Sequence, residues 1–186
     1  DFTSGQTQTV SIDNKTYTIT NNKTSANTLS YGFISGTNQI AFVGSSFSVT
    51  AADGQADNVR FFVNYGTLNT GDGNDSVNNS GEDSTIGLGA GDDTITNTGK
   101  YVKIDAGDGN DSVNNNSGYA TTIGLGAGED TITNSGPLVV ISKGETNSTD
   151  SVSTTKDNTV IVDEMFTMDF TSGQTQTVSI DNKTYT

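Results

Sequence analysis

The sequence contains no cysteine, no histidine and no tryptophan, and it has a single proline among its 186 residues. Without cysteine there is no disulfide or thiolate, and without histidine there is no imidazole to hold zinc or haem or to act as a general base. Basic residues are scarce too, with eight against 22 acidic residues and a net charge of −14. This charge repels nucleic acid phosphates and anionic lipid surfaces but attracts divalent cations. These features argue against an enzyme and favour a protein that binds a hard metal ion.

Long hydrophobic runs are also missing, since no stretch approaches the ~18 consecutive apolar residues of a membrane span. The first residues, Asp1-Phe2-Thr3-Ser4, lack the basic start of a secretion signal. We therefore expect a soluble fragment that inserts into no membrane and binds no nucleic acid.

The two ends of the sequence carry the same segment, because residues 1–18 recur letter for letter as residues 169–186. The simplest interpretation is one 168-residue unit of a tandem array followed by the opening of the next unit, and a cloning artefact is the alternative. Arrays of long identical units are typical of surface proteins that need reach, which favours a structural or adhesive role. Neighbouring copies are then the expected partners, joined head to tail through the duplicated segment, unless the extra copy makes no contact.

A shorter period of nine residues runs through residues 71–143 and is broken once by a block of ten. One aliphatic residue recurs with it: Val59, Leu68, Val77, Ile86, Ile95, Ile104, Val113, Ile123, Ile132, Ile141 and, after an insertion, Val152 and Ile161. The segments between are rich in glycine, asparagine and β-branched residues, which favour turns and strands over helices. Two nonapeptides make a coil of 18 residues, and strands of successive coils stack ~4.8 Å apart. The sequence therefore predicts an all-β fold, a parallel β-solenoid.

Alternate nonapeptides carry the motif Gly-x-Gly-x-Asp, and the turns between them read Asn-Ser-Gly or Asn-Thr-Gly. The motif ends at Asp75, Asp93, Asp111 and Asp130. Because these residues recur every 18 or 19 positions, they form one column on one edge of the solenoid. Two carboxylates ~5 Å apart repel by roughly 0.8 kcal/mol in water, and several times more where they are partly buried. We expect a cation between the loops, and carboxylates with the carbonyls of glycine turns form the oxygen shell that suits calcium better than magnesium.

These loops resemble the RTX, or haemolysin-type, calcium-binding repeat, whose nonapeptide reads Gly-Gly-x-Gly-x-Asp-x-apolar-x. Residues 70–78 match it everywhere except at the first glycine, as do the stretches that start at Leu88, Ala106 and Leu125, and the resemblance covers about residues 53–162. It implies an RTX-like β-roll with calcium ions between loops of adjacent coils, held by Asp side chains and backbone carbonyls. The implied ligands are Asp75, Asp93, Asp111 and Asp130, in loops shaped by Gly71, Gly73, Gly89, Gly91, Gly107, Gly109, Gly126 and Gly128.

Asp57 and Asp150 keep the spacing from the acid to the next valine at the two ends of the roll, where each either completes a terminal site or caps the stack. The four good loops thus predict three calcium ions in one column, and up to five if both ends take part. Because the alternate nonapeptides lack the motif, we expect the second ion column of a full RTX roll to be missing. The few aliphatic residues do not offset the entropy of ordering the backbone, so the roll should be largely disordered without calcium.

We divide the chain into a β-rich cap or connector (1–52), the calcium-binding roll (53–162), and a linker with the start of the next repeat (163–186). Residues 7–19 alternate as a strand pair around Asp13-Asn14-Lys15. We expect a non-enzymatic, calcium-stabilised structural repeat of a long extracellular surface protein, an adhesin or filament, where millimolar calcium loads the sites. The alternative is an adhesive module that binds a glycan or a cell surface through cap aromatics such as Tyr31 and Phe33.

Overall fold

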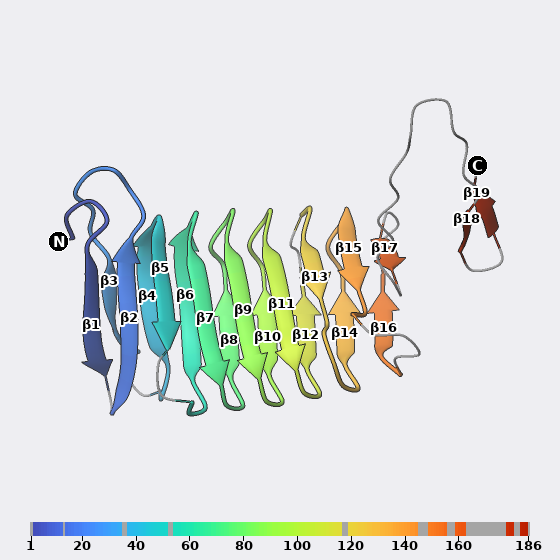
Figure 1. Ribbon diagram of the computed structural model, residues 1–186, viewed down its shortest axis with the longest axis horizontal. Coiled ribbons are helices and arrows are strands. Elements are labelled where there is room, and N and C mark those ends of the chain that lie inside the picture. Colours follow the sequence, from blue (N-terminus) through green and yellow to red (C-terminus); the bar gives the residue numbers. More distant parts are fainter. Residues whose placement is uncertain are drawn as a thin grey trace.

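The computed structural model describes residues 2–12, 14–34, 37–51, 54–116, 119–144, 149–155, 159–162, 178–180 and 183–185. Within these ranges the chain is all-β, and no helix is present that could cross a membrane. The strands stack as a parallel β-solenoid, which confirms the predicted fold class (Figure 1). Ile86 pairs with Ile104, and Ile104 with Ile123, so successive coils are 18 or 19 residues apart.

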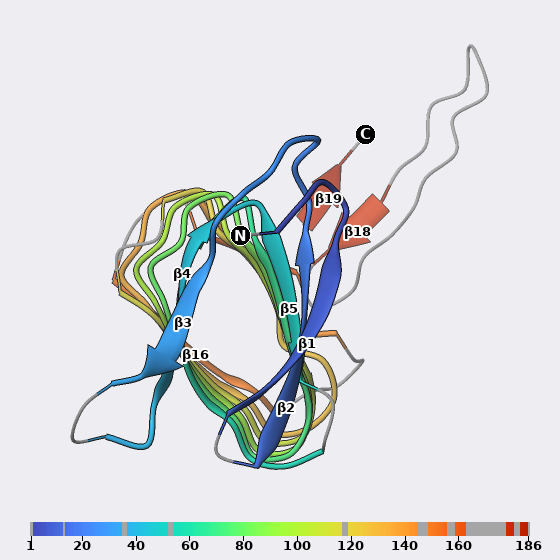
Figure 2. The ribbon, with the colours of Figure 1, turned by 90° about the vertical axis from the view of Figure 1, so that its left-hand side faces the viewer.

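Two sheets form the walls of the solenoid, and each coil gives one strand to each wall (Figure 2). The first sheet runs in the order β1 (Thr7–Ile12), β2 (Lys15–Asn21), β5 (Phe47–Ala51), β7 (Thr67–Asp72), β9 (Thr85–Ala90), β11 (Lys103–Asp108), β13 (Thr122–Gly124), β15 (Val139–Ser142) and β17 (Thr159–Val162). The second runs in the order β16 (Ser151–Thr154), β14 (Thr131–Asn134), β12 (Ser112–Asn115), β10 (Thr94–Asn97), β8 (Ser76–Asn79), β6 (Asn58–Asn64), β4 (Ile40–Ser45) and β3 (Ser30–Phe33).

The N-terminal end is closed by antiparallel strands. β1 and β2 form the hairpin that alternation predicted, with Asn14 at a positive φ of 61° in its turn. β2 then pairs antiparallel with β5, and β3 with β4. Parallel stacking begins where β4 meets β6 and β5 meets β7, so the first coil of the solenoid already lies within residues 1–52.

The described part of the C-terminal region is a second small hairpin, made of β18 (Val178–Ile180) and β19 (Lys183–Tyr185). Val178 pairs with Tyr185, as Val10 pairs with Tyr17 in the first copy of the segment. The duplicated sequence therefore makes the same hairpin register twice. The rest of residues 163–186 lies outside the described residues.

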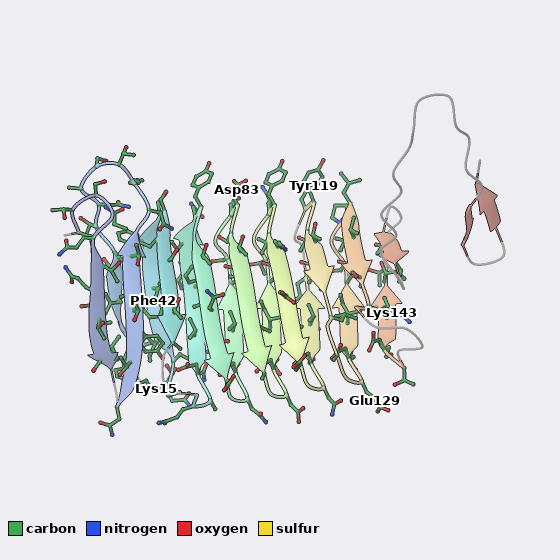
Figure 3. All side chains as sticks on the ribbon, in the orientation of Figure 1. Lys15, Phe42, Asp83, Tyr119, Glu129 and Lys143 are labelled. Atoms are coloured by element: carbon green, nitrogen blue, oxygen red, sulfur yellow. The ribbon has the colours of Figure 1, made fainter. Side chains whose placement is uncertain are left out.

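The two long edges of the solenoid differ in their turns (Figure 3). The glycine-rich loops, with Glu129, occupy one edge, and the turns with Asp83 and Tyr119 occupy the other. Among the described residues, the turns of this second edge contain these non-glycine residues with a positive φ: Ser46, Tyr65, Asp83, Tyr101, Ala120 and Leu138. Tyr101 and Tyr119 are exposed there and pack edge to face, with ring centroids 5.6 Å apart.

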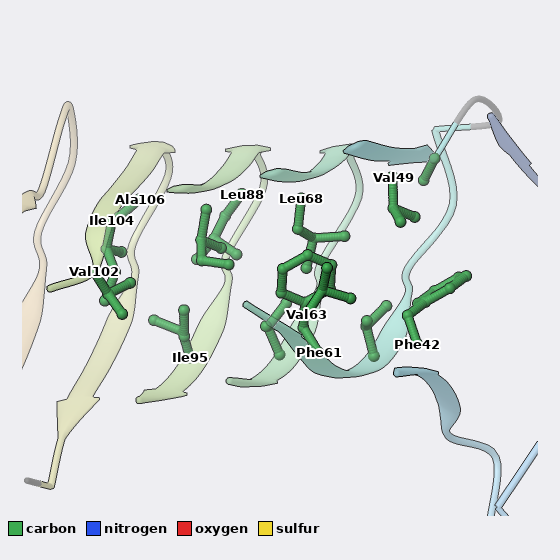
Figure 4. Close-up of a cluster of buried hydrophobic side chains, with 14 of the residues drawn as sticks. Phe42, Val49, Phe61, Val63, Leu68, Leu88, Ile95, Val102, Ile104 and Ala106 are labelled. Atoms are coloured by element: carbon green, nitrogen blue, oxygen red, sulfur yellow. The ribbon is translucent and has the colours of Figure 1, made fainter. Parts of the chain in front are cut away.

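The interior is filled by the aliphatic column that the nine-residue period predicted (Figure 4). All ten of its members from Val59 to Ile141 are at most 1% exposed. Aromatic residues fill the wider N-terminal end, where the buried ring of Tyr17 packs edge to face on Phe42 at 5.3 Å. Tyr31 and Phe33, in contrast, are 43% and 47% exposed on β3. The core thus extends through the stack, with polar side chains at its two long edges.

Candidate cation-binding edge

The backbone of the glycine-rich loops admits no side chain. Gly89 and Gly91 have φ of 112° and 133°, which L-residues rarely adopt. Successive loops also approach closely, since a Cβ on Gly107 would overlap the carbonyl oxygen of Gly89, and one on Gly109 that of Gly91. All eight glycines of the four loops have a positive φ: Gly71, Gly73, Gly89, Gly91, Gly107, Gly109, Gly126 and Gly128. A Cβ on any of them except Gly71 would overlap backbone atoms of the neighbouring loop. The glycine pattern therefore allows loops to stack with their carbonyl oxygens directed at the next loop.

The second recurring feature of each loop, its aspartate, forms a buried column. Asp75, Asp93, Asp111 and Asp130 are each at most 2% exposed, as is Asp57 one coil earlier. The structure thus brings the four predicted side-chain ligands, and Asp57, together on one edge. Their carboxylates lie just inside the loops, at the border of the hydrophobic interior.

Each aspartate of the column accepts a backbone hydrogen bond from the preceding coil. The N–H of Asp75 donates to Oδ1 of Asp93 at 2.7 Å, and the N–H of Asp93 donates to Oδ1 of Asp111 at 2.8 Å. The same bond joins Asp57 to Asp75 and Asp111 to Asp130. Backbone N–H groups therefore stabilise part of the negative charge of the column. From the sequence, we had expected a cation alone to do so.

The other carboxylate oxygen is buried without such a donor. The Oδ2 atoms of Asp57, Asp75, Asp93 and Asp111 have no hydrogen-bond partner. A buried acceptor without a partner is destabilising by about 1–3 kcal/mol, and by more when it is charged. A bound cation would supply the missing partner, so the buried oxygens are suited to a cation between adjacent loops.

Burial opposes the ionisation of this column. Desolvation raises the pKa of Asp93 from 3.8 to about 7, against the lowering effect of the Asp75 N–H. For Asp111 the pKa rises to about 6, again mainly by desolvation, and the pKa of Asp75 is raised for the same reason. Without a cation, Asp93 and Asp111 therefore keep their protons to a higher pH than an ordinary aspartate, and a cation would compete with those protons.

A second ladder runs outside the buried column. The N–H of Asp92 donates to Oδ1 of Asn74, that of Asn110 to Oδ1 of Asp92, and that of Glu129 to Oδ1 of Asn110, at 2.9–3.1 Å. These bonds point in the opposite direction along the stack from those of the buried column. Because acids alternate with asparagines, no two of the ladder's carboxylates lie on neighbouring coils.

At the N-terminal end of the column a lysine already pairs with the carboxylate. Lys15 Nζ lies 3.0 Å from Oδ1 of Asp57 and also donates to the carbonyl oxygen of Ala56. The hydroxyl of Tyr17 donates to the same Oδ1 at 2.6 Å. Both donors come from β2, so the hairpin of the cap is locked to the first aspartate. Of the two roles expected for Asp57, this geometry favours capping the stack.

At the C-terminal end, Asp150 continues the ladder. Its Oδ1 accepts the N–H of Asp130 at 3.0 Å, and it is less buried than the aspartates before it. Asp150 is thus in register with the column, although the residues just before it, 145–148, lie outside the described residues.

The opposite edge carries an asparagine column that the sequence analysis did not assign. Asn79, Asn97, Asn115 and Asn134 are buried, and the amide of each of the first three donates to Oδ1 of the next at 2.8–2.9 Å. Asn97 Oδ1 also accepts the N–H of Gly99, which closes the turn. The signal was present in the sequence, because these residues recur 18 or 19 apart at the ends of β8, β10, β12 and β14. The edge without the motif is therefore held by neutral amides.

The groups available for a cation are one buried carboxylate per coil and the carbonyls of the loops. In the part of the chain that the structure describes, no three acidic side chains converge on one point. The carbonyl oxygens of Gly73, Gly91 and Gly109 face the next loop. Each gap thus offers oxygens from two loops rather than a cluster of side chains. Comparison with protein-family models, curated proteins and solved structures finds no match to this chain.

Proposed function

We propose that the chain is a calcium-stabilised structural repeat of a long extracellular protein, a rigid spacer or assembly module. The observation that carries this proposal is the buried aspartate column next to stacked glycine loops, in which the Oδ2 atoms of Asp75, Asp93 and Asp111 lack hydrogen-bond partners. Asp75, Asp93, Asp111 and Asp130 would hold calcium together with loop carbonyls, with one ion between each pair of adjacent loops. Bound calcium would supply positive charge where the fold buries negative charge.

The number of ions follows from the ends of the column. The four loops leave three gaps between them, and Asp150 offers a fourth. Lys15 already supplies an ammonium at Asp57, so we place no ion between Asp57 and Asp75. Loop sites of this kind bind calcium weakly enough to need the millimolar concentrations found outside cells, which supports an extracellular location. The proposal involves no catalysis.

The experiment is a calcium titration followed by far-ultraviolet circular dichroism and by native mass spectrometry. We expect a coil spectrum in chelator, a sheet spectrum in millimolar calcium, and at least three bound ions per chain. Magnesium at the same concentration is the control, and it should not restore the sheet signal because it requires a smaller octahedral site. A full sheet spectrum in excess chelator, with no bound calcium in the mass spectrum, would refute the proposal.

A second candidate function is adhesion through the aromatic side chains of β3. Its support is the exposure of Tyr31 and Phe33, at 43% and 47%, in a chain whose other phenylalanines in the described part are not exposed to this degree. Aromatic faces are common platforms for sugar rings. Loss of a glycan-array signal in Tyr31→Ala, with an unchanged circular dichroism spectrum, would favour this function. An array without signal for the native chain would count against it.

A further inference from the structure

The solenoid exposes two edge strands at each of its ends (Figure 1). β1 and β3 are the edges at the N-terminal end, and β17 and β16 are those at the C-terminal end. Natural proteins usually protect such edges with charged residues or proline. None of these four strands, which read TQTVSI, SYGF, TVIV and SVST, contains either, although the chain has 22 acidic and eight basic residues. These four strands therefore lack the charges and prolines that discourage pairing with another chain.

Apolar side chains are less completely covered at the same ends. Ile141 is fully buried, but Ile161, its partner in the next coil, is 44% exposed. Val152 is likewise only partly buried, whereas Ile132 before it is fully buried. At the other end, Val10 and Ile12 of β1 pack only partly against the core. Each end thus has apolar side chains that a further layer of strands would cover.

The strand directions of the two ends are complementary. β1 is antiparallel to β2, and β2 is antiparallel to β5, so β1 runs parallel to β5 and to every later strand of its sheet, including β17. A β1 strand from another copy would thus extend the first sheet beyond β17 in the parallel sense. β3 is antiparallel to β4 and would extend the second sheet beyond β16 in the antiparallel sense. Both sheets would then continue across the joint.

The sequence places another copy where this joint requires it. The segment that begins at Thr175 repeats the one that begins at Thr7, where β1 starts, and its described part forms a hairpin of the same register. Twelve residues, 163–174, separate it from β17. Parallel neighbouring strands need a crossover of about a dozen residues, so this spacing suits a β1 strand laid beside β17.

We propose that units of this protein dock end to end, with β1 and β3 of one copy covering β17 and β16 of the copy before it. This inference builds on the proposed role as a repeat of an extended array and names the surface through which the units meet. The contact is heterologous, since one end binds the other, and such contacts generate open chains of units. The joint depends on strand edges and not on the aspartate column, so its test is separate from calcium binding.

The test compares lysine substitutions in the full chain by sedimentation velocity and electron microscopy, in millimolar calcium. We expect the native chain to associate with concentration into rods, and Ile161→Lys or Val10→Lys to weaken this association about tenfold or more because each charges one end. A mixture of these two variants should stop at dimers, because only one intact pair of ends remains. Val140→Lys is the matched control, since Val140 is similarly exposed, at 39%, but lies on an interior strand.

Circular dichroism of each variant distinguishes loss of end-to-end association from loss of the folded structure. If Val10→Lys changes the sheet spectrum, Thr9→Lys, which charges the same strand at an exposed position, replaces it. The proposal is overturned if the native chain stays monomeric at high concentration, if association survives both end substitutions, or if Val140→Lys weakens it equally. Failure of the calcium proposal would appear differently, as a sheet spectrum that chelator does not change.

Discussion

Replacing Asp93 by asparagine should have opposite effects on stability with and without calcium. The substitution keeps the shape of the side chain and an Oδ1 that accepts the N–H of Asp75. It removes the negative charge that burial opposes. A pKa raised from 3.8 to about 7 corresponds to roughly 4 kcal/mol that the ion-free fold loses when Asp93 ionises. At pH 8 without calcium, Asp93→Asn should therefore raise the free energy of unfolding by up to about this amount.

In calcium the same substitution should instead lower the free energy of unfolding, because Asp93 lies between two of the three gaps that the four loops define. Losing its carboxylate should remove ions on both sides, so the gain in unfolding free energy on adding calcium should fall by half or more. The assay is circular dichroism at pH 8. In chelator, where the native chain should be coil, Asp93→Asn should show more sheet signal, and in 5 mM calcium (about the millimolar range of extracellular sites) urea denaturation measures the loss of stability. Asp92→Asn is the control, since Asp92 is exposed on the same loop and its amide can still accept from Asn110. If Asp93→Asn left the calcium-dependent gain unchanged, Asp93 would not be a ligand.

Three further predictions concern the same edge. The raised pKa values of Asp93 and Asp111 mean that the folded state binds more protons than the unfolded state between about pH 4 and 7, so the ion-free fold should lose stability as pH rises through this window. The sheet signal in chelator, measured by circular dichroism, should therefore be larger at pH 5 than at pH 8. Lys15→Met leaves the buried Asp57 carboxylate without its ammonium and should lower the free energy of unfolding by about 3 kcal/mol. The control Lys103→Met removes an exposed lysine and should change the free energy of unfolding by less than about 0.5 kcal/mol. Equal effects of the two substitutions would contradict the capping role. In Gly107→Ala the new Cβ would sit on a residue with a φ of 103° and overlap the Gly89 carbonyl, so urea denaturation should show a loss of about 2 kcal/mol or more in the free energy of unfolding. In the control Gly32→Ala the new Cβ meets nothing within 4 Å, so the free energy of unfolding should be nearly unchanged.

The sequence predicted the repetitive part of the fold because each coil obeys the same local pattern. An aliphatic residue at every ninth position places one apolar side chain inward on each wall, and the core from Val59 to Ile141 follows it. The hairpin of residues 7–19 followed from simple alternation. Even the aspartate column could be located, because residues 18 or 19 apart must stack in a solenoid of that period.

What the sequence did not indicate depends on contacts that no local period encodes. Lys15 and Asp57 are 42 residues apart and meet only because β2 folds antiparallel onto β5. The N–H to Oδ1 ladder depends on how the loop backbone is oriented, which spacing alone does not fix. The asparagines of the second edge recur regularly in the sequence, but we did not predict that their amides form a hydrogen-bonded column. An uncharged residue in a turn is usually interpreted only as favouring the turn. Exposure of Tyr31 and Phe33 follows from β3 being an edge strand, which composition cannot show.

The alternation of acid and amide in the outer ladder gives each coil a preferred neighbour during folding. Inward-facing aliphatics and buried aspartates are nearly the same in every coil, so they would accept a coil stacked out of sequence. A coil that skipped its neighbour would bring Asp92 against Glu129, roughly 5 Å apart, with a repulsion of about 0.8 kcal/mol even in water. The same mistake would leave Asn74 against Asn110. The outer edge thus discriminates against wrong pairings that the interior tolerates, and a long array of identical units would face that ambiguity at every coil.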